Sequence, residues 1–95
     1  MPETIYVTID SLAPKPYEIL KPLRATIRPR GGEWIASFGA ANQHASGSTR
    51  EEALANLKDV IQASFEILSE YAPDKLGPGL AREFDVLKQF IRKRP

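Results

Sequence analysis

The chain contains no cysteine, and that absence excludes several kinds of chemistry at once. It rules out a disulfide framework, a thiolate nucleophile and a zinc site with cysteine ligands. The sequence also shows neither a signal peptide nor an apolar run long enough to cross a membrane. We therefore expect a soluble protein of the cytoplasm that has no membrane partner.

The chain also has little excess charge of either sign. It carries 13 basic and 12 acidic side chains, which leaves a net charge of +1. Such a balance creates no global field that would attract nucleic acid or a membrane surface. The local basic cluster of Arg92, Lys93 and Arg94 is expected to be a frayed, solvated tail. At 95 residues the chain is long enough for a single domain with its own core.

Groups that could form a catalytic site are scarce. The only histidine, His44, lies beside small residues and has no catalytic pattern around it, so a structural role is expected. Ser46, Ser48 and Ser64 lie outside any nucleophile-elbow sequence. The acidic residues are dispersed, and the glycine pairs lack the lysine of a phosphate-binding loop. We expect no enzyme activity, no metal site and no cofactor.

A period of two residues predicts strands in the first half of the chain. Ile5, Val7 and Ile9 alternate with polar residues, which indicates a half-buried strand over residues 4–9. Prolines at positions 14, 16 and 22 then predict a long loop or an irregular edge segment over residues 11–22. The alternation resumes over residues 23–28, with apolar side chains on one face and Arg24 and Arg28 on the other.

A tight hairpin turn is predicted at Gly31 and Gly32, because glycine tolerates the positive backbone angles that such turns need. Residues 33–38 should then return antiparallel, with Trp34, Ala36 and Phe38 on their apolar face. A brief further strand is predicted over residues 43–45.

A strong helix start follows at Thr49. Its hydroxyl can accept a hydrogen bond from the Glu52 amide, and the Glu52 carboxylate can reach back to the Thr49 amide. Over residues 50–72 the large apolar side chains fall in one arc. Its centre is formed by Leu54, Leu57, Ile61, Phe65 and Leu68. The opposite, polar face carries Glu51, Glu52, Asp59, Gln62, Glu66 and Glu70.

A second amphipathic helix is predicted over residues 79–93, after a break at Pro73 and a Gly-Pro-Gly run. Its apolar positions are Leu80, Phe84, Leu87 and Ile91. The apolar sides of both helices are wide, so they either pack within the domain or form a subunit or partner interface. Candidate residues for such an oligomer interface are Val60, Ile67, Tyr71, Phe84, Val86 and Phe90.

The middle of the chain resembles the HicB-like antitoxin domain. The resemblance spans about residues 23–68 and rests on the aromatic strand Trp34-Ile35-Ala36-Ser37-Phe38, the Gly47-Ser48-Thr49 turn and the helix start Glu51-Glu52-Ala53-Leu54. Residues 3–22 would add a strand and a proline-rich loop. Where the family often has an Asp-Leu-Pro-Gly-like loop, this chain has Gly39-Ala40-Ala41-Asn42. Many members also carry a DNA-binding domain, for which this chain offers only one further helix.

The resemblance implies an α+β fold of the partial ribonuclease-H-like kind, in which a long helix covers an antiparallel sheet of three to four strands. It also implies a non-catalytic protein that binds and masks a small toxin ribonuclease. The acidic helix residues Glu51, Glu52, Asp59, Glu66 and Glu70 are candidates for that contact. Two alternatives remain open: a stand-alone homo-oligomer, with a dimer considered first, and a nucleic-acid binder that uses Arg24, Arg28 and Arg30 with Tyr6 as a stacking surface.

Overall fold

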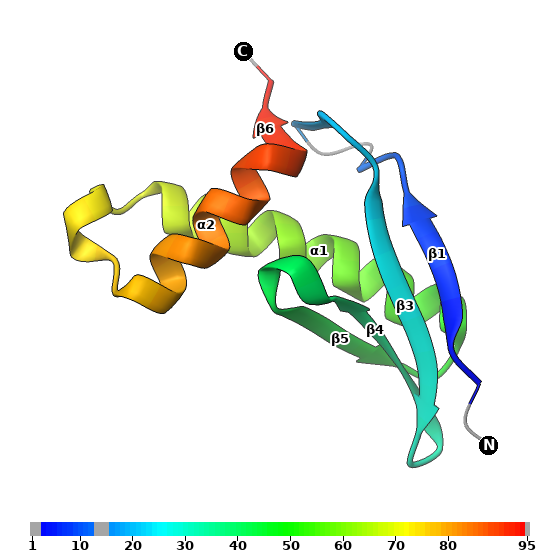
Figure 1. Ribbon diagram of the computed structural model, residues 1–95. Coiled ribbons are helices and arrows are strands. Elements are labelled where there is room, and N and C mark those ends of the chain that lie inside the picture. Colours follow the sequence, from blue (N-terminus) through cyan, green and yellow to red (C-terminus); the bar gives the residue numbers. More distant parts are fainter. Residues whose placement is uncertain (1–2, 13–15, 95) are drawn as a thin grey trace.

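Four antiparallel strands form the main sheet of the protein (Figure 1). The computed structural model describes residues 3–12 and 16–94. The strands lie in the order β1, β3, β4, β5, so sequence neighbours within this sheet pair with each other. Their bounds are β1 (Ile5–Ile9), β3 (Leu23–Arg30), β4 (Glu33–Phe38) and β5 (Gln43–Gly47). The expected α+β class is confirmed, and the brief strand predicted at residues 43–45 is two residues longer.

The predicted hairpin joins β3 to β4. Gly31 and Gly32 have φ angles of 56° and 83°, in the left-handed region that favours glycine, and Arg30 pairs with Glu33 across the turn. After β4, the 3-10 helix η1 (Gly39–Ala41) leads into Asn42, whose φ of 54° is left-handed. The alternation predicted for β3 is also confirmed, because Leu23, Ala25 and Ile27 are buried whereas Arg24 and Arg28 are exposed.

One face of the sheet is covered by the long helix α1 (Arg50–Ser69), which lies behind the sheet in Figure 1. Leu57 and Ile61 are fully buried against the inward side chains of the strands. The predicted N-cap is confirmed, since Thr49 Oγ1 accepts from the Glu52 amide at 3.0 Å. The Glu52 carboxylate, however, accepts from the amide of Ser48 rather than that of Thr49, because the bend after Gly47 brings the earlier amide within its reach.

The C-terminal helix is shorter than the sequence predicts. Helix α2 (Pro78–Phe90) ends where β6 (Ile91–Lys93) begins, and β6 pairs antiparallel with β2 (Tyr17–Ile19) in a second, two-stranded sheet. The prediction of helix over residues 91–93 is therefore wrong. Ile91 is extended and fully buried, because backbone pairing with β2 and burial of its side chain outweigh the helical spacing.

The expected solvated tail is also corrected by this pairing. Arg92 contacts the Glu18 carboxylate, and the Arg94 amide donates to the Pro16 carbonyl at 2.7 Å. The proline-rich segment is thus partly a strand, and its residues 13–15, with Pro14, lie outside the described residues.

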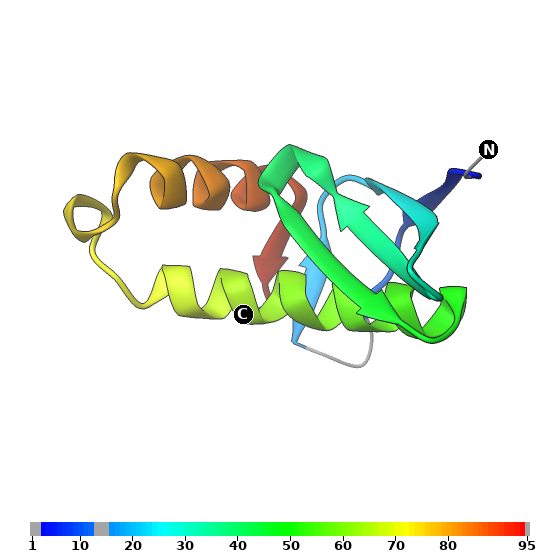
Figure 2. The same ribbon diagram turned by 90° about the horizontal axis from the view of Figure 1, so that it is seen from below.

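Helices α1 and α2 form a hairpin that extends beyond the sheet (Figure 2). The 3-10 helix η2 (Pro73–Lys75) lies in the connection at its far end. Edge-to-face aromatic contacts hold the near end, where Phe84 packs on Phe65 and Phe90 packs on Phe38. In the part of the chain that the structure describes, neither helix is long and apolar enough to cross a membrane.

We predict that Gly47→Ala destabilises the fold, because α1 begins so close to this glycine. A Cβ atom there would lie 2.5 Å from the Ala53 nitrogen and 2.9 Å from the Glu52 carbonyl carbon, both backbone atoms that cannot move aside cheaply. Such overpacking should lower the free energy of unfolding by about 1–3 kcal/mol, measured by urea denaturation. Gly39→Ala is the matched control, since its Cβ meets nothing within 4 Å. An equal loss in the free energy of unfolding for both substitutions would contradict the close approach of Gly47 to α1.

Candidate binding surfaces

The acidic residues predicted for the outer side of α1 are all exposed, but they do not form one uninterrupted face. Gln62, expected among them, is only 6% exposed, because β2 and its flanking residue Pro16 lie over that part of the helix. Two of the carboxylates are engaged within the chain: Glu52 caps the helix, and Glu66 accepts from the Tyr17 hydroxyl. The carboxylates of Glu51, Asp59 and Glu70 form no hydrogen bond or ion pair with another described residue.

A hollow of about 460 Å³ lies where β2 meets this side of α1. It is lined by Pro16, Tyr17, Asp59, Gln62, Ala63 and Glu66. The Gln62 side-chain nitrogen donates to the Lys58 carbonyl at 3.2 Å, whereas its Oε1 is buried without a hydrogen-bond partner in the described structure. A buried acceptor without a hydrogen bond lowers the stability of the fold. The carboxylates of Asp59 and Glu66 at the hollow therefore favour a cationic group there.

Tyr17 closes one side of the hollow. Its hydroxyl donates to Glu66 Oε2 at 2.6 Å, and its ring packs edge-to-face on Phe65. Burial raises the pKa of Tyr17 to about 12, and the hydrogen bond to Glu66 and the negative charge of that carboxylate act in the same direction. On the other side of Glu66, the Lys93 ammonium lies 4.0 Å from Oε1.

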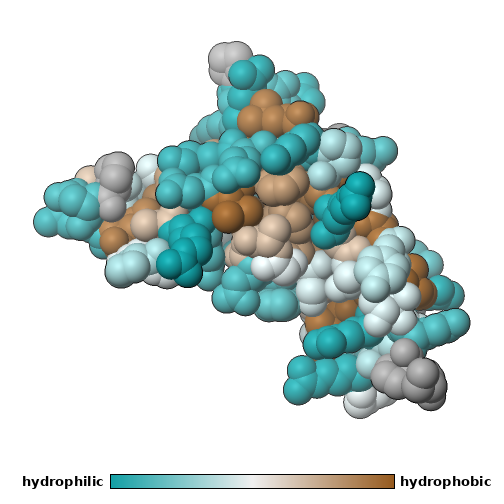
Figure 3. All heavy atoms as spheres, in the orientation of Figure 1, coloured by the Kyte–Doolittle hydropathy of each residue, from teal (hydrophilic) through white to brown (hydrophobic). Residues whose placement is uncertain are grey.

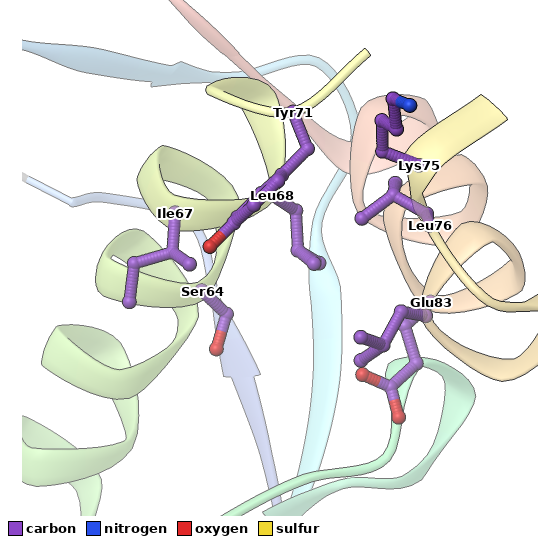
Figure 4. Close-up of a pocket in the computed structure, with 8 residues that line it drawn as sticks. Ser64, Ile67, Leu68, Tyr71, Lys75, Leu76 and Glu83 are labelled. Carbon is purple, nitrogen blue, oxygen red and sulfur yellow. The ribbon is translucent and has the colours of Figure 1, made fainter. Parts of the chain in front are cut away.

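A second, more apolar groove of about 330 Å³ separates α1 from α2 near the far end of the helical hairpin (Figure 4). It is lined by Ser64, Ile67, Leu68, Tyr71, Lys75, Leu76, Leu80 and Glu83. Around it, Ile67, Tyr71 and Leu80 are 55%, 54% and 49% exposed, which is unusual for large apolar side chains.

The residues expected at an oligomer interface are divided between this groove and the core. Ile67 and Tyr71 line the groove, whereas Phe84, Val86 and Phe90 pack against the core of their own chain. Val60 is half-buried on α1. Self-association through these residues stays a prediction.

The sheet face opposite α1 carries a different set of side chains. Tyr6, Thr26, Ser37 and His44 are consecutive Cα partners across the four strands, so they form one row. Arg24 and Arg28 lie two residues before and after Thr26 on β3, and both are exposed. Arg30 lies beyond them at the hairpin turn, opposite Glu33. The structure thus brings Tyr6, Arg24 and Arg28 together on one surface, with Arg30 at its end.

A chain of hydrogen bonds at one end of this row was not predicted from the sequence. His44 Nδ1 lies 2.8 Å from Ser37 Oγ, and His44 Nε2 lies 3.1 Å from Asn42 Oδ1. The Asn42 amide nitrogen donates to Glu83 Oε1 at 3.2 Å, which aims the Asn42 oxygen at the imidazole. His44 Nε2 can then donate to this oxygen, and Nδ1 of a neutral ring can accept from the Ser37 hydroxyl.

This arrangement resembles a nucleophile with its base, but acyl transfer also needs amide donors aimed at a developing oxyanion in a site that excludes water. Ser37 and His44 lie in paired strands, where backbone amides serve the sheet, and the imidazole is exposed. The contacts therefore suit the structural role expected for His44. The signal that could have found Ser37 is its register, opposite His44 in the hairpin of β4 and β5.

Among the described residues, no group of three or more histidine and carboxylate side chains is arranged to hold a metal ion. Comparison of the chain with family models, curated proteins and solved structures finds no match. The function is accordingly inferred from the surfaces of the molecule itself.

The raised pKa of Tyr17 predicts a loss of stability at high pH. The native protein retains the phenolic proton above pH 10, where the unfolded chain releases it, so unfolding is coupled to proton loss. The contribution of Tyr17 to the free energy of unfolding is complete below pH 10 and falls as the pH rises toward 12. Tyr17→Phe should flatten this fall in urea unfolding experiments, although it also removes a hydrogen bond at neutral pH. Parallel pH profiles for the two proteins would contradict the assignment.

Proposed function

We propose that the chain is a non-catalytic protein-binding module of the antitoxin kind, which inhibits a small RNA-cleaving protein by covering its basic substrate surface. A protein that binds RNA presents lysine and arginine side chains to the phosphates. An acidic surface of fitting shape can occupy those side chains in place of RNA, and complementary charge also speeds the encounter.

The observation that carries the proposal is the line of carboxylates on α1. Glu52, Asp59, Glu66 and Glu70 are spaced by seven, seven and four residues, which places them along one side of a helix. The carboxylates of Asp59 and Glu70 form no hydrogen bond or ion pair with another described residue, so their charges are available to a partner.

The hollow between Asp59 and Glu66 also supports binding of a basic partner. A lysine or arginine side chain that enters it would meet both carboxylates. Such an inserted cation is typical of the few residues that supply most of the energy of an interface.

Co-expression with the product of any neighbouring gene that encodes a small basic protein tests the proposal. We expect a stable complex and relief of the partner's RNA-cleaving toxicity. The double substitution Asp59→Lys with Glu70→Lys should weaken the complex about 100-fold in calorimetric titration, because it places like charges against the partner's basic surface. Both side chains are exposed, so the variant should retain its fold in circular dichroism.

Asp74→Lys with Asp85→Lys is the matched control, since it changes the net charge equally at exposed positions away from this side of α1. It should leave affinity nearly unchanged apart from a weak long-range effect that salt screens. A complex that forms equally well with both double variants would refute the acidic surface as the contact. Failure of the unsubstituted chain to bind the partner or relieve its toxicity would refute the antitoxin function.

A further inference from the structure

The sheet face opposite α1 is open to solvent, and it looks toward the reader in Figures 1 and 3. Helix α1 packs behind the sheet, while α2 contacts η1 beside the sheet instead of covering its front. Figure 3 shows that strongly hydrophilic side chains gather along β3 and near the hairpin, with smaller apolar areas between them. This face is therefore available to a ligand in the folded chain.

Tyr6 is the most exposed large apolar residue of the described chain, with 81% of its surface in contact with solvent. It lies on the edge strand β1, opposite Thr26 of β3, and its ring forms no aromatic contact with another described residue. Such a ring on an open sheet offers a flat stacking surface that the fold itself does not use.

Basic side chains flank this ring. Arg24 is the Cα partner of Thr8, and Arg28 lies four residues further along β3, so the two guanidinium groups stand on either side of the Tyr6–Thr26 pair. Neither forms an ion pair or a hydrogen bond with another described residue. Arg24 and Arg28 thus make the surroundings of Tyr6 locally basic, although the net charge of the chain is only +1.

The rest of the row supplies polar groups. Ser37 and His44 continue from Thr26 toward the other edge of the sheet. Both ring nitrogens of His44 are already engaged, with Ser37 and Asn42, so the Thr26 hydroxyl and the remaining lone pairs of the Ser37 hydroxyl are the groups that can hydrogen-bond to base edges or sugars. At about 4.8 Å between strands, the row from Tyr6 to His44 spans about 14 Å, which is room for about two or three bases.

We propose that this open face binds single-stranded nucleic acid, with one base stacked on Tyr6 and neighbouring phosphates held by Arg24 and Arg28. RNA is the expected form, because a 2′-hydroxyl gives the hydroxyl groups of Thr26 and Ser37 an additional group to contact. A duplex is excluded as the ligand, since its bases are stacked on each other and cannot reach the Tyr6 ring. The site is independent of the protein-binding function proposed above, which uses α1 on the opposite side of the sheet.

Fluorescence anisotropy with a labelled octauridine RNA tests the proposal in low-salt buffer with the full chain. We expect saturable binding, weaker binding to the matching DNA strand and none to an RNA duplex. With two phosphates neutralised, the logarithm of the association constant should fall with the logarithm of salt concentration with a slope of about −1.4. Tyr6→Ala should weaken binding about tenfold, and Arg24→Glu with Arg28→Glu should abolish it.

Matched controls separate this face from general charge and aromatic effects. Tyr71→Ala removes an exposed tyrosine from the helical groove, and Arg82→Glu reverses an exposed charge on α2. Both controls should bind within about twofold of the unsubstituted chain once salt screens long-range charge. Absence of binding at low salt would overturn the proposal. Binding that Tyr6→Ala and Tyr71→Ala weaken equally, or that a duplex matches, would also overturn it.

Discussion

The close approach of Gly47 to the first turn of α1 is the constraint on which the rest of the structure depends. Only a residue without a side chain fits there, since a Cβ would meet the backbone of Glu52 and Ala53. The chain can therefore turn from β5 into α1 through Ser48 and Thr49 alone, and the helix returns along the sheet it has just left. The cap between Thr49 and Glu52 fixes where the helix begins.

This junction determines where every other element can lie. A helix of 20 residues is about 30 Å long, whereas a strand of five or six residues spans only about 20 Å. The second half of α1 consequently extends past the sheet, and α2 folds back against that half. Since β6 continues directly from α2, the chain's end returns to β2 across the outer side of α1. One face of the main sheet thus stays uncovered, and the groove between the helices lies away from it.

The elements that depend on local sequence could be predicted, and those that depend on distant pairing could not. The hairpin at Gly31 and Gly32 and the cap at Thr49 follow from residues within a few positions of each other. The helix predicted at Ile91 is wrong because the apolar spacing of this residue suits a helix face and a buried strand equally. Only pairing with β2, more than 70 residues earlier in the chain, decides between helix and strand. Gln62 was placed on the polar side of α1 for the same reason, since the strand that buries it comes from elsewhere in the chain.

The candidate surfaces show the same division. The exposure of Arg24 and Arg28 followed from alternation along one strand, whereas the row from Tyr6 to His44 and the Ser37 contact required the register of four strands. The central claim is that the sheet has one covered face and one open, ligand-binding face. Amide chemical-shift mapping of the ¹⁵N-labelled chain during titration with octauridine tests it most directly. The account predicts shifts in β1, β3 and β4 around Tyr6, Thr26 and Ser37, with α1 unchanged; shifts centred on α1 or α2 would contradict it.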